Sequence, residues 1–143
     1  MEKILLAVDG SAACDKAVKK TLELVDEMDA EVTVLTVMEK NITPLSDSSE
    51  DRENKYPDDD EYVAKAKSIA HDCASVFEGR AKKLNRIVEA GSPAEIICEE
   101  AENGEYDFVV LSDMGKHALK RFFLGSTTEK VVRHCNTSVM VVK

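Results

Sequence analysis

The chain has 143 residues, of which 43% are hydrophobic and 33% charged, a balance typical of one globular domain with its own core. Its formal net charge of −9 at pH 7 disfavours non-specific binding to nucleic acid or to an anionic membrane. No apolar run approaches the ~20 residues of a membrane-spanning helix, and no basic region followed by an apolar signal core opens the chain. We therefore expect a cytoplasmic protein that binds neither membranes nor nucleic acid.

The first part of the chain predicts two strands and a helix. Residues 3–8 form a near-continuous apolar run, which is typical of a strand buried on both faces of a parallel sheet. Residues 9–11 interrupt this run, and apolar residues at helical spacing then continue to about residue 28. Residues 31–38 are rich in β-branched side chains and predict the second strand.

Residues 39–58 form the one long irregular segment, and the stretch from Asp47 to Glu61 holds eight acidic and two basic residues. Such a composition buries little apolar surface, so a mobile surface loop is expected here. The alternative is a lid or a partner-binding arm, because long loops often carry function.

The middle of the chain predicts a long helix from about residue 58. The helix dipole favours the acidic residues at its start. Gly79 is expected to weaken the helix locally. One apolar stripe runs along the whole segment and consists of Val63, Ala66, Ala70, Cys73, Phe77, Ala81 and Leu84.

Three further strands are expected at residues 85–90, 107–111 and 138–142. A helix lies between the first two of these strands, with a capping box at Ser92–Glu95 and a stop at Asn103–Gly104. Another helix is expected at residues 127–134.

The alternation of strand and helix indicates an α/β domain, residues 1–143, with a parallel five-stranded sheet and right-handed crossovers. In such sheets ligands bind at the carboxyl ends of the strands, where the strand order reverses. If the fourth strand lies beside the first, the loops after Val8 and Leu111 face each other. The residues alone leave this strand order open.

The segment after Leu111 favours phosphate binding. A buried strand gives way to a loop that contains Gly115, and Gly125–Ser126 then precede a helix. Glycine permits close approach of the backbone, and helix N-termini attract anions. Two alternatives stay open: Gly115 is a plain turn glycine, or Ser126 only caps its helix through the segment Ser126–Glu129.

Ser112-x-x-Gly115, followed by nine residues and Gly125–Ser126, resembles the nucleotide-binding branch of the universal stress protein family. The opening residues 4–11, the junction 90–95 and the final strand also resemble that family. The resemblance implies a doubly wound sheet of order 3-2-1-4-5 with helices on both faces, of the adenine nucleotide alpha hydrolase-like, Rossmann-like class. It also implies ATP as the ligand, with or without Mg²⁺.

The resemblance assigns Asp9 to a ribose or adenine amino group, beside an apolar adenine wall; the alternative is that Asp9 caps the helix after Gly10. The remaining contacts are expected from the loop after the fourth strand and from the helix start. The full set of expected nucleotide-binding residues is Ala7, Val8, Asp9, Val37, Leu111, Ser112, Asp113, Met114, Gly115, Lys116, His117, Gly125, Ser126 and Thr127.

Three residues depart from the family pattern. Ser112 adds a side chain where the motif has glycine, Asp113 adds negative charge near the expected phosphates, and Met114 stands where a polar or basic residue is common. A basic cluster could offset this charge, or it is only a solvated helix face, and Asp113 could help to hold Mg²⁺. The cluster consists of Lys116, His117, Lys120 and Arg121.

We therefore predict an ATP-binding regulatory or signalling module with an unidentified protein partner, and no residue is predicted to be catalytic. The alternative is a dimeric interaction module of the same family that binds no nucleotide, which Ser112 favours. Slow ATP hydrolysis is a third possibility. The final strand, if it is the sheet edge, predicts a homodimer, because proteins rarely leave an apolar edge unpaired.

Overall fold

The computed structural model describes residues 1–39, 60–114 and 124–143. Glu39 belongs to the second strand, and the rest of the expected acidic loop lies outside the described residues. The expected ligand residues Gly115, Lys116 and His117 also lie outside them, together with the rest of the basic cluster.

The sheet has five parallel strands in the order β3-β2-β1-β4-β5, which confirms the expected topology. The register places Ile4 of β1 between Val32 of β2 and Phe108 of β4. The strands are β1 (Glu2–Ala7), β2 (Ala30–Glu39), β3 (Lys83–Gly91), β4 (Phe108–Ser112) and β5 (Ser138–Val142).

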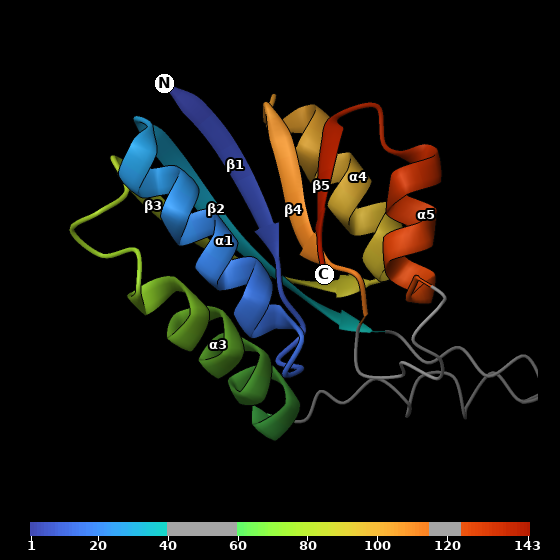
Figure 1. Cartoon of the computed structure of the whole chain (residues 1–143). Helices are drawn as coiled ribbons and strands as arrows, with labels where there is room; N and C mark the ends of the chain where they lie inside the picture. Colours follow the sequence, from blue (N-terminus) through green and yellow to red (C-terminus); the bar gives the residue numbers. More distant parts are fainter. Residues whose placement is uncertain (40–59, 115–123) are drawn as a thin grey trace, which may run out of the picture.

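The described helices cover both faces of the sheet, with α1 and α3 on one face and α4 and α5 on the other (Figure 1). Successive side chains of β1 point to opposite faces, so Ile4 and Leu6 pack in the first core while Leu5 packs in the second. All three are fully buried. The helices are α1 (Cys14–Glu27), α3 (Asp60–Ser75), α4 (Pro93–Asn103) and α5 (Ser126–His134).

The expected length of the helix before β3 is wrong. Helix α3 ends at Ser75, and Gly79 has a φ of +73°, a left-handed conformation that ends rather than weakens a helix. Phe77 is fully buried within the turn that follows α3. Leu84, the last residue of the expected stripe, lies in β3. The apolar pattern therefore continued across a helix, a turn and the start of a strand.

The capping box expected at Ser92–Glu95 is also wrong. Ser92 does precede α4, and Pro93 occupies its first turn, but the Ser92 side chain makes no capping hydrogen bond with any described residue. Gly104 ends α4 as expected, although its φ of −82° is right-handed; Glu105 takes the left-handed φ of 52°.

All four cysteines are free thiols; Cys14 is buried, and the other three are partly buried and pack against the core clusters. Cys98 of α4 and Cys135, just after α5, pack against the same apolar cluster. Burial and the neighbouring Cys135 thiol raise the pKa of Cys98 to about 12.

Thr36 carries a buried hydroxyl that has no hydrogen-bond partner among the described residues, and the residue is 3% exposed. We expect Thr36→Val to raise the free energy of unfolding by about 1 kcal/mol, because it removes a desolvated polar group and keeps the side-chain shape. Denaturant titration measures this change. The control is Thr33→Val on the same strand, which should lower stability because Thr33 Oγ1 accepts a hydrogen bond from Tyr106 Oη at 2.8 Å. A lower stability for Thr36→Val would contradict the expectation.

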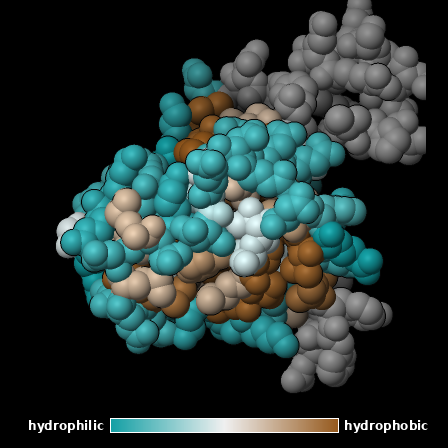
Figure 2. All heavy atoms as spheres, turned by 90° about the horizontal axis from the view of Figure 1, so that it is seen from above, coloured by the Kyte–Doolittle hydropathy of each residue, from teal (hydrophilic) through white to brown (hydrophobic). Residues whose placement is uncertain are grey.

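β5 is the outer strand of the sheet on the β4 side. The Asp113 amide donates to the Val142 carbonyl oxygen at 3.0 Å, so Val142 presents its backbone groups to β4. Backbone groups alternate along a strand, and Val141 therefore directs its N–H away from the sheet. The surface seen from above is mostly hydrophilic, and hydrophobic residues show in several places, with the largest group at the lower right of the view (Figure 2). In β5 itself, four apolar residues are partly exposed: Val139, Met140, Val141 and Val142.

None of the helices in the described part of the chain has the length and apolar character needed to span a lipid bilayer.

Candidate functional site

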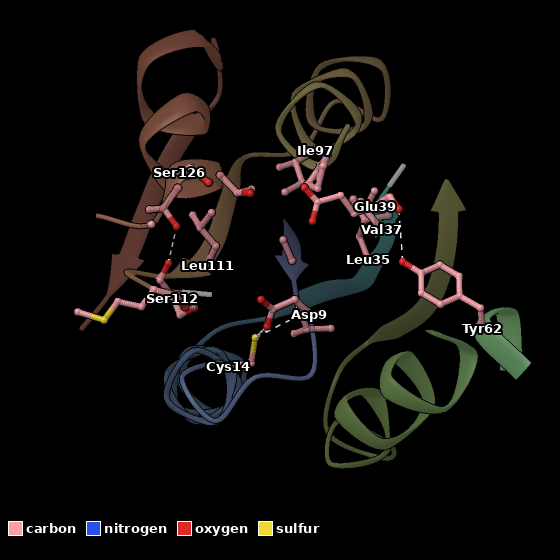
Figure 3. Close-up of a pocket in the computed structure, with 17 residues that line it drawn as sticks. Asp9, Cys14, Leu35, Val37, Glu39, Tyr62, Ile97, Leu111, Ser112 and Ser126 are labelled. Carbon is pink, nitrogen blue, oxygen red and sulfur yellow. Dashed lines mark hydrogen bonds between the residues drawn. The ribbon is translucent and has the colours of Figure 1, made fainter. Parts of the chain in front are cut away.

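A cavity of about 260 Å³ opens at the carboxyl ends of β1, β2 and β4, where the strand order reverses (Figure 3). This volume lies just below the range of ~300–1,000 Å³ common for small-molecule sites. The lining residues are Ala7, Val8, Asp9, Cys14, Leu35, Val37, Glu39, Tyr62, Pro93, Ile97, Leu111, Ser112, Met114, Gly125, Ser126, Thr127 and Thr128.

The cavity has an apolar wall made by strand ends and by α4. Leu35 and Val37 come from β2, Leu111 comes from β4, and Ile97 comes from the first part of α4 (Figure 3). All four pack in or against the same core cluster, so the wall continues the core of that face. Such a wall suits the flat face of an aromatic base.

Asp9, in the turn after β1, provides a carboxylate to the cavity. Its Oδ1 accepts hydrogen bonds from the Ser11 amide and from the Cys14 thiol, both at 2.9 Å. The alternative in which Asp9 caps the following helix is wrong, because α1 begins at Cys14 and its N-cap position is Ala13. Gly10, with a φ of +79°, makes the turn, and a Cβ at this position would lie 2.8 Å from Ile69 Cδ1 of α3.

The start of α5 forms another side of the cavity. Gly125 is the N-cap residue, and Ser126 is the first helical residue, so the capping box expected at Ser126 is wrong. In the described part of the chain, no side chain caps this helix. Ser126 and Thr127 line the cavity. Uncapped amides at a helix start carry partial positive charge and bind anions.

Ser112 is the last residue of β4 and lines the cavity. Its hydroxyl donates to the Met114 carbonyl oxygen at 2.6 Å, and its own carbonyl oxygen accepts from Thr128 Oγ1 at 2.7 Å. The hydroxyl is therefore turned to the backbone of its own loop. Asp113 lies outside the lining; its carbonyl oxygen accepts from the Gly125 amide at 2.7 Å and so joins the end of β4 to the start of α5.

Ten of the fourteen expected ligand residues line one cavity: Ala7, Val8, Asp9, Val37, Leu111, Ser112, Met114, Gly125, Ser126 and Thr127. Of the other four, Asp113 lies beside the cavity and Gly115, Lys116 and His117 lie outside the described residues.

Sequence reasoning missed seven lining residues. Leu35 and Pro93 follow from the strand order, because β2 and the β3–α4 junction end at the same edge as β1. No sequence pattern marks Tyr62 as a lining residue, because its position depends on how α3 packs. Its hydroxyl donates to the Glu39 carbonyl oxygen at 3.4 Å. The seven residues are Cys14, Leu35, Glu39, Tyr62, Pro93, Ile97 and Thr128.

In residues 1–39, 60–114 and 124–143, no three His, Cys, Asp or Glu side chains gather in a way that could hold a metal ion. The Cys14 thiol contacts the Asp9 carboxylate, as the thiol of a catalytic cysteine would contact a base. Burial, however, raises the pKa of this thiol. A protonated thiol is a weak nucleophile.

Comparison with protein families matches the whole chain, residues 1–143, to the universal stress protein family. The chain belongs to this family. A universal stress protein of Methanocaldococcus jannaschii is 30% identical over 146 residues, which cover 99% of this chain and 82% of that protein. The solved structure of the universal stress protein UspA from Lactobacillus plantarum has a TM-score of 0.85 at 25% identity, with 99% of this chain and 97% of that chain covered.

Two more distant members of the universal stress protein family were solved with adenine nucleotides. One is from Archaeoglobus fulgidus, in complex with dAMP; it is 16% identical, with a TM-score of 0.73, and covers 100% of this chain and 98% of its own. The other is from Arabidopsis thaliana, with AMP bound; it is 21% identical, with a TM-score of 0.70, and covers 100% of this chain and 92% of its own. At these identities they support the shared fold.

Proposed function

We propose that this universal stress protein binds ATP and acts as a regulatory or signalling module in the cytoplasm. One observation carries the proposal: a single cavity at the strand-order reversal joins an apolar wall, the Asp9 carboxylate and the uncapped start of α5. These are the three kinds of group that a base, a sugar and a phosphate require. Family members that were solved with AMP and dAMP support the choice of an adenine nucleotide.

The ligand orientation follows from the chemistry of the lining. The base packs on Val37, Leu111 and Ile97, and Asp9 accepts a hydrogen bond from a ribose hydroxyl or from the adenine amino group. The phosphates point to Ser126 and Thr127 at the start of α5, where backbone amides and the helix dipole favour negative charge. The size of the cavity suits the nucleoside, so the phosphates extend toward its mouth.

The lining holds few ligands for Mg²⁺ beside the expected phosphates. Glu39 lies on the opposite side of the cavity from Ser126 (Figure 3), and Asp113 lies outside the described lining. Mg²⁺ commonly binds through phosphates and keeps several waters. We therefore propose that Mg²⁺ enters with ATP, held by its phosphates, with the Ser126 and Thr127 hydroxyls nearby.

Calorimetry on nucleotide-free protein tests the binding. We expect ATP and AMP to bind, and tripolyphosphate to bind at least about tenfold more weakly than ATP, because it has no base for the apolar wall. Mass spectrometry of the denatured purified protein should release an adenine nucleotide. If neither ATP nor AMP produces heat and no nucleotide is released, the proposal is wrong.

One observation favours the alternative, an interaction module without a nucleotide. Ser112 carries a side chain at a lining position where the family motif has glycine. Its hydroxyl is bonded to the Met114 carbonyl oxygen, which keeps the group directed to the loop backbone. Absence of nucleotide binding together with a stable dimer would select this alternative. In either case the edge strand β5 supports a homodimer, which leaves the other surfaces for an unidentified protein partner.

A further inference from the structure

We infer that Cys14 is a positioning residue for the nucleotide, and that it holds the Asp9 carboxylate in the orientation that faces the ligand. This inference rests on the proposed function and extends it to a residue that does not need to touch the base or the phosphates. It assigns to the thiol a role in binding rather than in chemistry.

Two reciprocal hydrogen bonds join Cys14 and Asp9. The Cys14 thiol donates to Asp9 Oδ1 at 2.9 Å, and the Asp9 amide points to Cys14 Sγ at 3.3 Å (Figure 3). The Ser11 amide donates to the same Oδ1 at 2.9 Å, and Ser11 Oγ lies 3.5 Å from the sulfur. The thiol therefore helps to fix both the side chain and the backbone of the residue that precedes the Gly10 turn.

The surroundings of Cys14 keep the thiol available as a donor. Cys14 is 3% exposed, packs in the core and lines the cavity from the first position of α1. Burial and the hydrogen bond to Asp9 raise the pKa of the thiol. The proton therefore stays on the sulfur at neutral pH, and the S–H group can donate to the carboxylate throughout ligand binding.

Loss of the thiol donor should change the orientation of the Asp9 carboxylate and leave the fold intact. The thiol is one of two described donors to Oδ1, so its loss removes one restraint on the rotation of the carboxylate about its side-chain bonds. If the carboxylate faces the ligand in only a fraction of the protein molecules, the apparent affinity for the ligand falls in proportion to that fraction. The loss of ATP affinity caused by a substitution at Cys14 should therefore require the Asp9 carboxylate.

The experiment is a double-mutant cycle measured by calorimetry with ATP. We expect Cys14→Ala to weaken ATP affinity about fivefold, the size of one ordinary hydrogen bond. Cys14→Ser, which keeps an O–H donor, should stay within about twofold of the wild type. In an Asp9→Ala background, Cys14→Ala should have no further effect, because no carboxylate is left to orient.

Two controls separate positioning from packing. Cys14→Val lacks a donor but fills the space of the thiol, so it should behave as Cys14→Ala does, with folding checked by denaturant titration. Cys73→Ala removes a partly buried thiol of α3 outside the cavity lining and should leave ATP affinity unchanged.

The inference is overturned if Cys14→Ala and Cys14→Val bind ATP as the wild type does, or if Cys14→Ala weakens binding equally in the Asp9→Ala background. In both cases the wild type still binds ATP and the proposed function stands. A wild type that binds no adenine nucleotide would overturn the function and the inference together.

Discussion

Gly125→Val should weaken ATP binding at least about tenfold, which corresponds to about 1.4 kcal/mol. Gly125 is the N-cap residue of α5 and lines the cavity at the place expected for the phosphates. A branched side chain there would occupy the space that the anion needs next to the helix amides. Calorimetry with ATP measures the change.

The backbone conformation of Gly125 allows valine without strain, so a loss of affinity in Gly125→Val reports on the added side chain. Gly125 has φ −58° and ψ 151°, an extended conformation that any residue adopts, so valine should fold in its place. Gly125→Ala is the graded control: its single methyl group should reduce affinity less than valine does. Equal ATP affinity in the wild type and in Gly125→Val would remove the phosphates from this end of α5.

Val141→Pro should convert the proposed homodimer to monomer and raise its dissociation constant at least about tenfold, because a two-fold axis removes the same hydrogen bond twice. The outer edge of β5 is the proposed contact, paired antiparallel with the same strand of a second copy. Val141 directs its N–H outward, as the bond from the Asp113 amide to the Val142 carbonyl oxygen indicates. Proline therefore removes an outward donor while the bonds to β4 remain.

Light scattering over a dilution series measures the association. Val141→Thr is the matched control, because it keeps the N–H and the branched shape and should remain a dimer. Wild-type protein that is monomeric at micromolar concentration would reject the dimer. A dimer that tolerates Val141→Pro would place the interface on another surface.

The sequence predicted the elements well where a local pattern matched a local structure. The apolar runs at β1 and β4 and the glycine near α5 placed the strands and the helix start within one or two residues. The strand order came from the family resemblance, because pairing between distant segments leaves no periodic signal. The end of α3 could not be predicted from spacing: Phe77 continues the helical stripe although its backbone has already turned.

The sequence predicted those residues of the candidate site that belong to recognisable motifs. Asp9 and Gly125–Ser126 stand at element boundaries, which sequence patterns mark clearly. Tyr62 and Ile97 line the same cavity from helices whose sequence shows only ordinary amphipathic spacing. Their contribution depends on how α3 and α4 pack across the sheet, and packing of this kind is a property of the folded chain.

The central position of β1 has a consequence for synthesis. β1 is translated before β4, so one of its two edges stays open until β4 follows and Ile4 pairs with Phe108. A nascent chain that ends before β4 exposes that edge beside the apolar side chains of Leu5 and Leu6, a combination that favours aggregation. The cavity walls come from both sides of this seam. The binding site can therefore form only after β4 and the start of α5 have been translated, and a bound ligand would distinguish chains that contain α5 from chains interrupted before it.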